Sequence, residues 1–101
     1  MNKYFYYERS SYKSNYFLIR LHHGNLPIGG TLGSCNVLMA RICNLSYASY
    51  LRMCRDKFNA QIIGKGTIYG MAYFPVEKES KVKELVKILN ERTEKILKNI
   101  T

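Results

Sequence analysis

Glycine, threonine and serine residues between positions 29 and 34 form the segment best suited to seat a phosphate group. The stretch reads Ile28-Gly29-Gly30-Thr31-Leu32-Gly33-Ser34 and leads into a predicted helix. Uncovered backbone N–H groups next to a helix N-terminus bind phosphate well. The residues predicted to do so are Gly29, Gly30, Thr31, Gly33 and Ser34. The spacing fits neither a P-loop nor a dinucleotide fingerprint, so a plain turn is the alternative.

Basic residues with tyrosines nearby form a second candidate anion site. Arg contacts phosphate through paired hydrogen bonds, and aromatic rings stack on bases for about 1–3 kcal/mol per base. The predicted ligand-binding residues are Arg20, His22, Arg41, Arg52, Arg55, Lys57 and Lys65, and the predicted stacking residues are Tyr12 and Tyr16. They form one surface if the helix carrying Arg52 and Arg55 lies against the first hairpin. The alternative is a solvated helix face.

The adjacent pair His22 and His23 invites a metal or nuclease interpretation. Neighbouring residues on a strand point to opposite faces, so the two rings cannot easily share one ion. Glu8 and Asp56 are the only acidic residues before position 77, which is too few for a two-metal site. We therefore predict no catalytic residue, no metal and no cofactor, and a small His-dependent nuclease is the least favoured alternative.

Positive charge dominates the composition. The chain has 16 Lys and Arg against 7 Asp and Glu, a formal charge of +9. Such a field attracts polyanions. The length of 101 residues suits a single domain spanning 1–101. The chain has no apolar run long enough for a membrane span, and three cysteines without a C-x-x-C pair indicate reduced thiols, hence a cytoplasmic location. Cys35, Cys43 and Cys54 are interpreted as core residues.

The pattern of apolar residues predicts the elements that must position these side chains. Residues 3–9 and 16–23 predict an antiparallel hairpin, with Tyr16, Leu18, Arg20 and His22 on one face of its second strand. Helices are predicted at about 35–43 and at 47–59, the latter with Ser46 as N-cap and Asn59 as C-cap. Strands at 61–63 and 67–74 are joined at Gly64-Lys65-Gly66.

A final helix is predicted from Ser80, its cap, to about Asn99. Its apolar stripe comprises Val82, Leu85, Val86, Leu89, Thr93, Ile96, Leu97 and Ile100. The element order β-β-(α)-α-β-β-α predicts an α+β fold, with an antiparallel sheet of about four strands and the helices on one face. A homodimer would cover the sheet's other face.

Two short segments resemble the G-x-x-G loop of KH domains, which clamps the backbone of single-stranded nucleic acid. The first is Gly30-Thr31-Leu32-Gly33, and the second is Ile62-Ile63-Gly64-Lys65-Gly66-Thr67. What the first resemblance implies is a phosphate contact in the glycine-rich stretch. The second is interpreted as a hairpin turn, from whose tip Lys65 reaches a phosphate.

The run from Tyr50 to Asn90 is similar in composition and layout to small accessory proteins of phages from AT-rich hosts. That resemblance implies an inhibitor of a host defence system, such as an anti-CRISPR, acting in the host cytoplasm. The same layout is similar to the second half of LAGLIDADG homing-endonuclease domains. The acidic helix motif of that family is absent, which argues against nuclease activity.

These observations together predict a small, basic, non-enzymatic protein that binds a phosphate-rich ligand, either nucleic acid or a nucleotide signal. The alternative is a protein–protein inhibitor whose basic face covers an acidic patch or a nucleic-acid channel of a host enzyme. The expected partners are thus nucleic acid or a nucleotide, a host defence protein, or a second copy of the chain, and no membrane.

Overall fold

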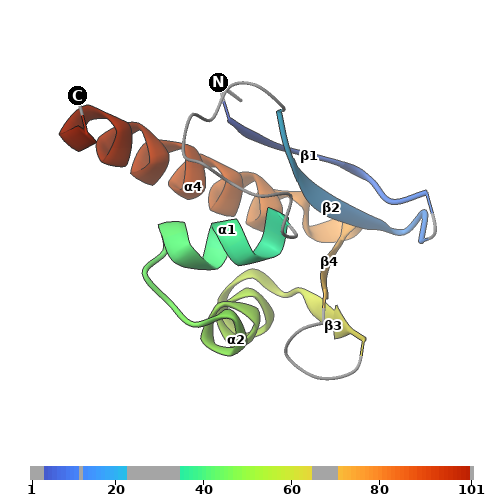
Figure 1. Cartoon of the computed structure of the whole chain (residues 1–101). Coiled ribbons are helices and arrows are strands. Elements are labelled where there is room, and N and C mark those ends of the chain that lie inside the picture. The colour runs from blue at the N-terminus through green and yellow to red at the C-terminus, as the bar shows by residue number, and fades with distance from the viewer. Residues whose placement is uncertain (1–3, 12, 23–34, 65–70, 101) are drawn as a thin grey trace.

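Within the residues that the structure describes, four antiparallel strands form a sheet and three α-helices lie against one of its faces (Figure 1). The structure is a computed structural model, and it describes residues 4–11, 13–22, 35–64 and 71–100. The strands are β1 (Phe5–Arg9), β2 (Tyr16–Leu21), β3 (Gln61–Ile63) and β4 (Met71–Pro75), and the helices are α1 (Cys35–Ile42), α2 (Tyr47–Phe58) and α4 (Glu79–Ile100). This confirms the α+β layout predicted from the sequence.

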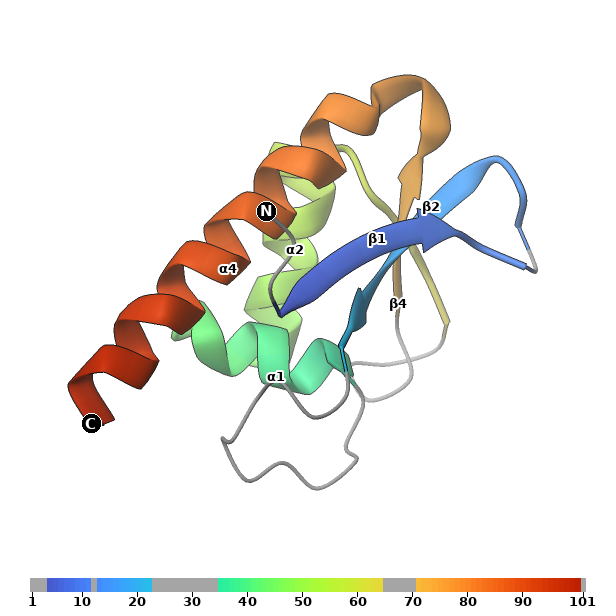
Figure 2. The ribbon, with the colours of Figure 1, turned by 90° about the horizontal axis from the view of Figure 1, so that it is seen from above.

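The sheet has the strand order β1-β2-β4-β3, so the two hairpins meet at β2 and β4. α4 packs across β1, β2 and β4, whereas α2 packs against β3 and β4, and α1 packs on α2 and α4. Figure 2 shows all three helices on the same side of the β1–β2 hairpin. The core between sheet and helices contains fully buried large side chains, among them Phe5, Tyr50, Phe74, Leu85 and Leu89.

The first hairpin follows the predicted alternation of apolar and polar residues. Its register pairs Phe5 with Leu21 and Arg9 with Phe17, and residues 10–15 connect the strands, as predicted. Phe5, Phe17 and Ile19 are buried against the helices. Because successive residues of a strand alternate between faces, the residues between them point away from the helices.

The second hairpin differs from the prediction at its turn. β3 and β4 pair Gln61 with Tyr73 and Ile63 with Met71. A tight turn at 64–66 would have paired Ile63 with Thr67, so the predicted three-residue connection is wrong. Residues 65–70 lie outside the described part of the chain. Gly64 has a positive φ of 117°, which glycine adopts without strain.

Helix α2 has the caps that the sequence predicted. The Ser46 side chain accepts a hydrogen bond from the Ser49 N–H at 3.2 Å. Asn59 is left-handed at φ 60°, and its N–H donates to the Cys54 carbonyl. The predicted apolar face is also present, because Tyr50, Leu51, Cys54 and Phe58 are buried.

Helix α4 begins earlier than predicted. A 3-10 turn, η1 (Val76–Lys78), runs directly into α4 at Glu79, so Ser80 lies inside the helix and is not its cap. Pro75 at φ −59° and ψ 136° ends the strand and starts this turn, which leaves no gap for a Ser80 cap. The predicted stripe is confirmed for Val82, Leu85, Val86, Leu89 and Thr93, all buried. No helix in the described ranges is long and apolar enough to cross a membrane.

Helix α4 also fixes the position of β1 through polar contacts. The Asn90 side chain, which is buried, accepts hydrogen bonds from the N–H groups of Tyr4 and Phe5 at 3.2 and 2.8 Å. Its amide donates to the Phe5 carbonyl at 3.1 Å. The hydroxyls of Tyr4 and Tyr7 donate to the carboxylates of Glu94 and Glu79. These bonds hold β1 on the helix, and they thereby orient the residues on its other face.

Candidate nucleic-acid interface

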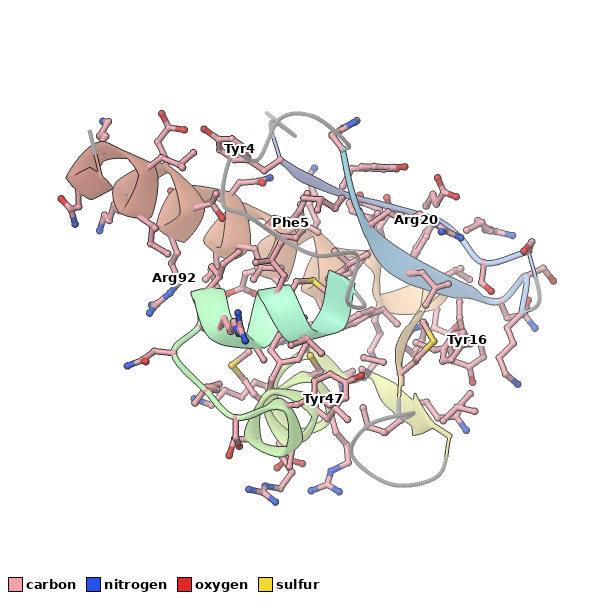
Figure 3. All side chains as sticks on the ribbon, viewed as in Figure 1. Tyr4, Phe5, Tyr16, Arg20, Tyr47 and Arg92 are labelled. Carbon is pink, nitrogen blue, oxygen red and sulfur yellow. The ribbon has the colours of Figure 1, made fainter. Side chains whose placement is uncertain are left out.

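The face of the sheet that points away from the helices carries aromatic rings on three strands. We call it the open face. Its members follow from the strand alternation and the register, and in Figure 3 Arg20 and Tyr16 lie on the opposite side of the sheet from Phe5. The open face comprises Tyr6, Glu8, Tyr16, Leu18, Arg20, His22, Gln61, Ile63, Met71, Tyr73 and Pro75. None of these residues belongs to the buried class.

Two pairs of rings stand on the open face. Tyr6 of β1 and His22, which follows β2, have ring centroids 4.3 Å apart at an interplanar angle of 32°. Tyr16 of β2 and Tyr73 of β4 have centroids 6.2 Å apart at 79°, an edge-to-face arrangement. All four side chains are only partly buried. Partly exposed rings spread over a sheet form a platform on which planar groups such as nucleic-acid bases stack.

An ion pair lies between the two ring pairs. The Arg20 Nε atom is 3.1 Å from a carboxylate oxygen of Glu8, and both side chains are 47% exposed. Tyr6 is directly opposite Arg20 in the register, and Leu18 is directly opposite Glu8. The ion pair therefore runs diagonally across β1 and β2, with the Tyr6–His22 rings beside it.

The part of the open face nearest β3 is apolar. Ile63 and Met71 are partners in the β3–β4 register, and both side chains are half-buried. Leu18 of β2 is half-buried as well. The face thus has an aromatic and charged portion on β1 and β2, and an apolar portion toward β3.

The other predicted ligand-binding residues of the described chain lie on the helices. Arg52, Arg55 and Lys57 are exposed on α2, and Arg41 is exposed on α1. Because α2 packs mainly against β3, β4 and the other helices, it does not lie against the first hairpin as the single-surface prediction required. Arg20 points away from the helices, so the structure does not bring it together with Arg52 and Arg55. It does bring Arg20, His22 and Tyr16 onto one face.

The arginines of α2 already have partners. Arg55 Nε contacts an Asp56 carboxylate oxygen at 2.8 Å, and a nitrogen of Arg52 donates to the Ser49 hydroxyl at 3.2 Å. The hydrogen bond from Arg55 holds the pKa of Asp56 below its usual value. No aromatic contact is present on this helix face in the described residues.

Several predicted residues lie outside the described part of the chain. They are the phosphate-loop residues Gly29, Gly30, Thr31, Gly33 and Ser34, together with Tyr12, His23 and Lys65. Both of the KH-like segments therefore fall wholly or partly outside it. Among the described residues, no group of three or more His, Cys, Asp or Glu side chains could hold a metal ion.

Tyr6, Tyr73 and Glu8 belong to the open face but were not predicted as site residues from the sequence. The signal for Tyr6 and Glu8 was present, because period-two alternation along β1 places them opposite the buried Phe5. Tyr73 alternates in the same way with the buried Ala72 and Phe74. These residues come together only because β1, β2 and β4 belong to one sheet, and the sequence does not give that strand order.

Comparisons with known proteins add no relative to this description. No family model, curated protein or solved structure matches the chain. Any functional proposal must therefore come from the open face itself.

Proposed function

We propose that this chain is a non-enzymatic protein that binds single-stranded nucleic acid on the open face of its sheet. The observation that carries the proposal is the set of four partly exposed rings, Tyr6, His22, Tyr16 and Tyr73, on the face that none of the described helices covers. Stacking of bases on such rings is strong and tolerates sequence variation, since every base has a π-face.

The charge of the chain supports a polyanionic ligand. The formal charge of +9 attracts phosphates over long distances and accelerates their encounter with the protein. Lys13, in the loop at the hairpin end of the face, has an exposed side chain. It is available to contact the backbone of a strand whose bases lie on the rings.

A single strand fits this face better than a duplex. The rings need bases that are splayed out, and those of a duplex are stacked on each other and paired. A duplex would offer only its phosphates, and the helix-side arginines would serve it as well as Arg20. Selectivity for single strands therefore separates ring-mediated binding from simple charge attraction.

The test is fluorescence anisotropy with labelled oligonucleotides of about ten nucleotides, of mixed sequence, as single strands and as duplexes. The expected result is tighter binding of the single strand, with the logarithm of the association constant falling linearly with the logarithm of salt. Arg20→Ala should weaken binding, whereas the matched change Arg55→Ala on α2 should weaken it only slightly. Equal affinity for single strand and duplex, or equal effects of the two variants, would overturn the proposal.

A second candidate is a protein–protein contact on the same face. The apolar portion formed by Leu18, Ile63 and Met71 favours it, because apolar residues ringed by polar ones are typical of protein-binding surfaces. In this case Met71→Gln, which adds no charge, would abolish capture of a purified partner protein and leave oligonucleotide affinity unchanged. A role as a phage inhibitor of host defence, by either route, stays a prediction from composition and layout.

A further inference from the structure

We infer that Glu8 and Arg20 read the edge of a stacked base, and that the base they favour is guanine. The inference rests on the proposed function and deepens it from a general affinity for single strands to a preference at one nucleotide. It also assigns Arg20 to a base edge, in place of the phosphate contact expected from the sequence.

The position of the ion pair points to this role. Tyr6 and Glu8 are two residues apart on β1 and on the same face, a separation of about 7 Å along the strand. A base that stacks on the Tyr6–His22 rings therefore extends its edge over the Glu8 carboxylate and the Arg20 guanidinium. The contact between Arg20 and Glu8 is made by the Nε atom at 3.1 Å, and the two terminal nitrogens of the guanidinium carry four further N–H donors.

The chemistry of the pair selects among bases. A carboxylate only accepts hydrogen bonds, and it has two oxygens side by side. Guanine alone presents two adjacent donors, N1–H and the N2 amino group, on its Watson–Crick edge, with the acceptor O6 next to them. Glu8 accepts from the two donors while Arg20 donates to O6. Uracil, adenine and cytosine each present a single donor position beside a lone pair that a carboxylate repels.

Electrostatics gives a reason for a carboxylate in this place. A negative charge at the centre of a phosphate-binding face weakens general attraction, and an exposed ion pair contributes little to stability. Glu8 is one of only two acidic residues among the first 70. The other, Asp56, pairs with Arg55 on α2 in similar exposure but without neighbouring rings, and it serves as the natural control.

The experiment uses uracil oligonucleotides of about nine nucleotides whose central base is uracil, adenine, guanine or inosine. Hypoxanthine, the base of inosine, is guanine without the N2 amino group. The expected result is that the guanine oligonucleotide binds about 10-fold more tightly than the others, since a bidentate contact discriminates by about 1–3 kcal/mol. Glu8→Gln should remove the preference for guanine over inosine, so that the two oligonucleotides bind equally. Asp56→Asn should leave the preference as it is in the wild type.

Two failures are distinguishable. If the wild-type protein binds all four oligonucleotides equally, the guanine inference is overturned and single-strand binding stands. If it binds none of them, the proposed function is overturned together with this inference. A guanine preference that persists in Glu8→Gln would also overturn the inference, because it would place recognition elsewhere.

Discussion

The open face of the sheet and the outer face of α2 both carry an exposed arginine–carboxylate pair. On the open face Arg20 pairs with Glu8, and partly exposed rings lie beside them; on α2 Arg55 pairs with Asp56, and no ring contact is found among the described residues there. The pairs are similar in length and exposure. This difference indicates that an exposed arginine does not by itself identify a binding site. The residues around the arginine decide which ligand it can recognise.

The largest expected effect comes from removing rings. Tyr6→Ala combined with Tyr16→Ala removes one ring from each pair, and each stacked base contributes about 1–3 kcal/mol. We therefore expect the affinity for a single-stranded oligonucleotide to fall by about 30-fold or more. Anisotropy titration at constant salt measures this loss.

The matched control is Arg52→Ala combined with Arg55→Ala, which removes two charges from α2. It should lower affinity only slightly, through the weaker field of the whole chain. If the α2 variant lost as much affinity as the ring variant, the comparison between the two faces would be reversed and α2 would be the binding surface.

A smaller effect is expected on the free energy of unfolding when Asn90 is changed. The Asn90 side chain holds β1 on α4, and β1 carries part of the open face. Asn90→Ala leaves the N–H groups of Tyr4 and Phe5 and the carbonyl of Phe5 without their side-chain partner. Buried polar groups without partners cost about 1–3 kcal/mol, so the free energy of unfolding should fall by about 2–4 kcal/mol. Urea unfolding followed by circular dichroism measures it.

Asn99 provides the control on the same helix, because its side chain is exposed. Asn99→Ala should change the free energy of unfolding by about 0.5 kcal/mol or less. A loss at Asn90 no greater than that at Asn99 would mean that β1 is held on α4 mainly by its apolar contacts, and that the position of Tyr6 and Glu8 does not depend on the Asn90 side chain.

The elements of this fold were predictable because each has a local signal. Alternation identified β2, Ser46 and Asn59 marked the ends of α2, and the spacing of buried residues identified α4. The predicted start of α4 at Ser80 was wrong because the helix follows the turn after Pro75 without a side-chain cap. The predicted connection of the second hairpin at 64–66 was wrong although glycines on both sides of Lys65 fit a tight turn. The strand register depends instead on which residues face the core.

The candidate site was less predictable because it depends on how strands pair. Arg20, His22 and Tyr16 were placed on one face by alternation alone, but their neighbours Tyr6 and Tyr73 come from strands that only the sheet order brings together. The assumption that Arg52 and Arg55 join Arg20 failed for the same reason. The side of the sheet on which a helix packs is a tertiary property, and the charge pattern of that helix contains no information about it.

The two faces should also respond separately when α2 itself is weakened. Ser46→Ala removes the acceptor for the Ser49 N–H and should lower the free energy of unfolding by about 1 kcal/mol. Because the open face does not include α2, oligonucleotide affinity should be unchanged at a temperature where the variant remains folded. The exposed Ser14 of the hairpin loop offers the control, since Ser14→Ala removes no helix cap. A drop in affinity with Ser46→Ala would contradict the separation of the two faces.

The smallest expected effect concerns Tyr7, which follows Tyr6 in β1 but points to the covered side of the sheet. Its hydroxyl donates to the Glu79 carboxylate at 2.6 Å, and its ring lies edge-on to Phe17. The hydrogen bond to Glu79, followed by burial, raises the pKa of Tyr7 from 10.0 to about 12. The folded state thus favours the neutral phenol, so this contribution to stability is complete below pH 10 and is lost as the pH rises from 10 toward 12.

Urea unfolding across that pH range should show that the wild type has a larger free energy of unfolding than Tyr7→Phe below pH 10, and that the difference shrinks as the pH rises toward 12. The reason is that phenylalanine keeps the ring but has no proton to lose. Burial also raises the pKa of Cys54, to about 12, but that thiol is present in both proteins and cancels in the difference. Parallel stability curves for the two proteins would contradict the Tyr7–Glu79 contact. Tyr7→Phe should at the same time leave oligonucleotide affinity intact below pH 10. Tyr6 would then contribute to binding and Tyr7 to stability, from opposite faces of strand β1.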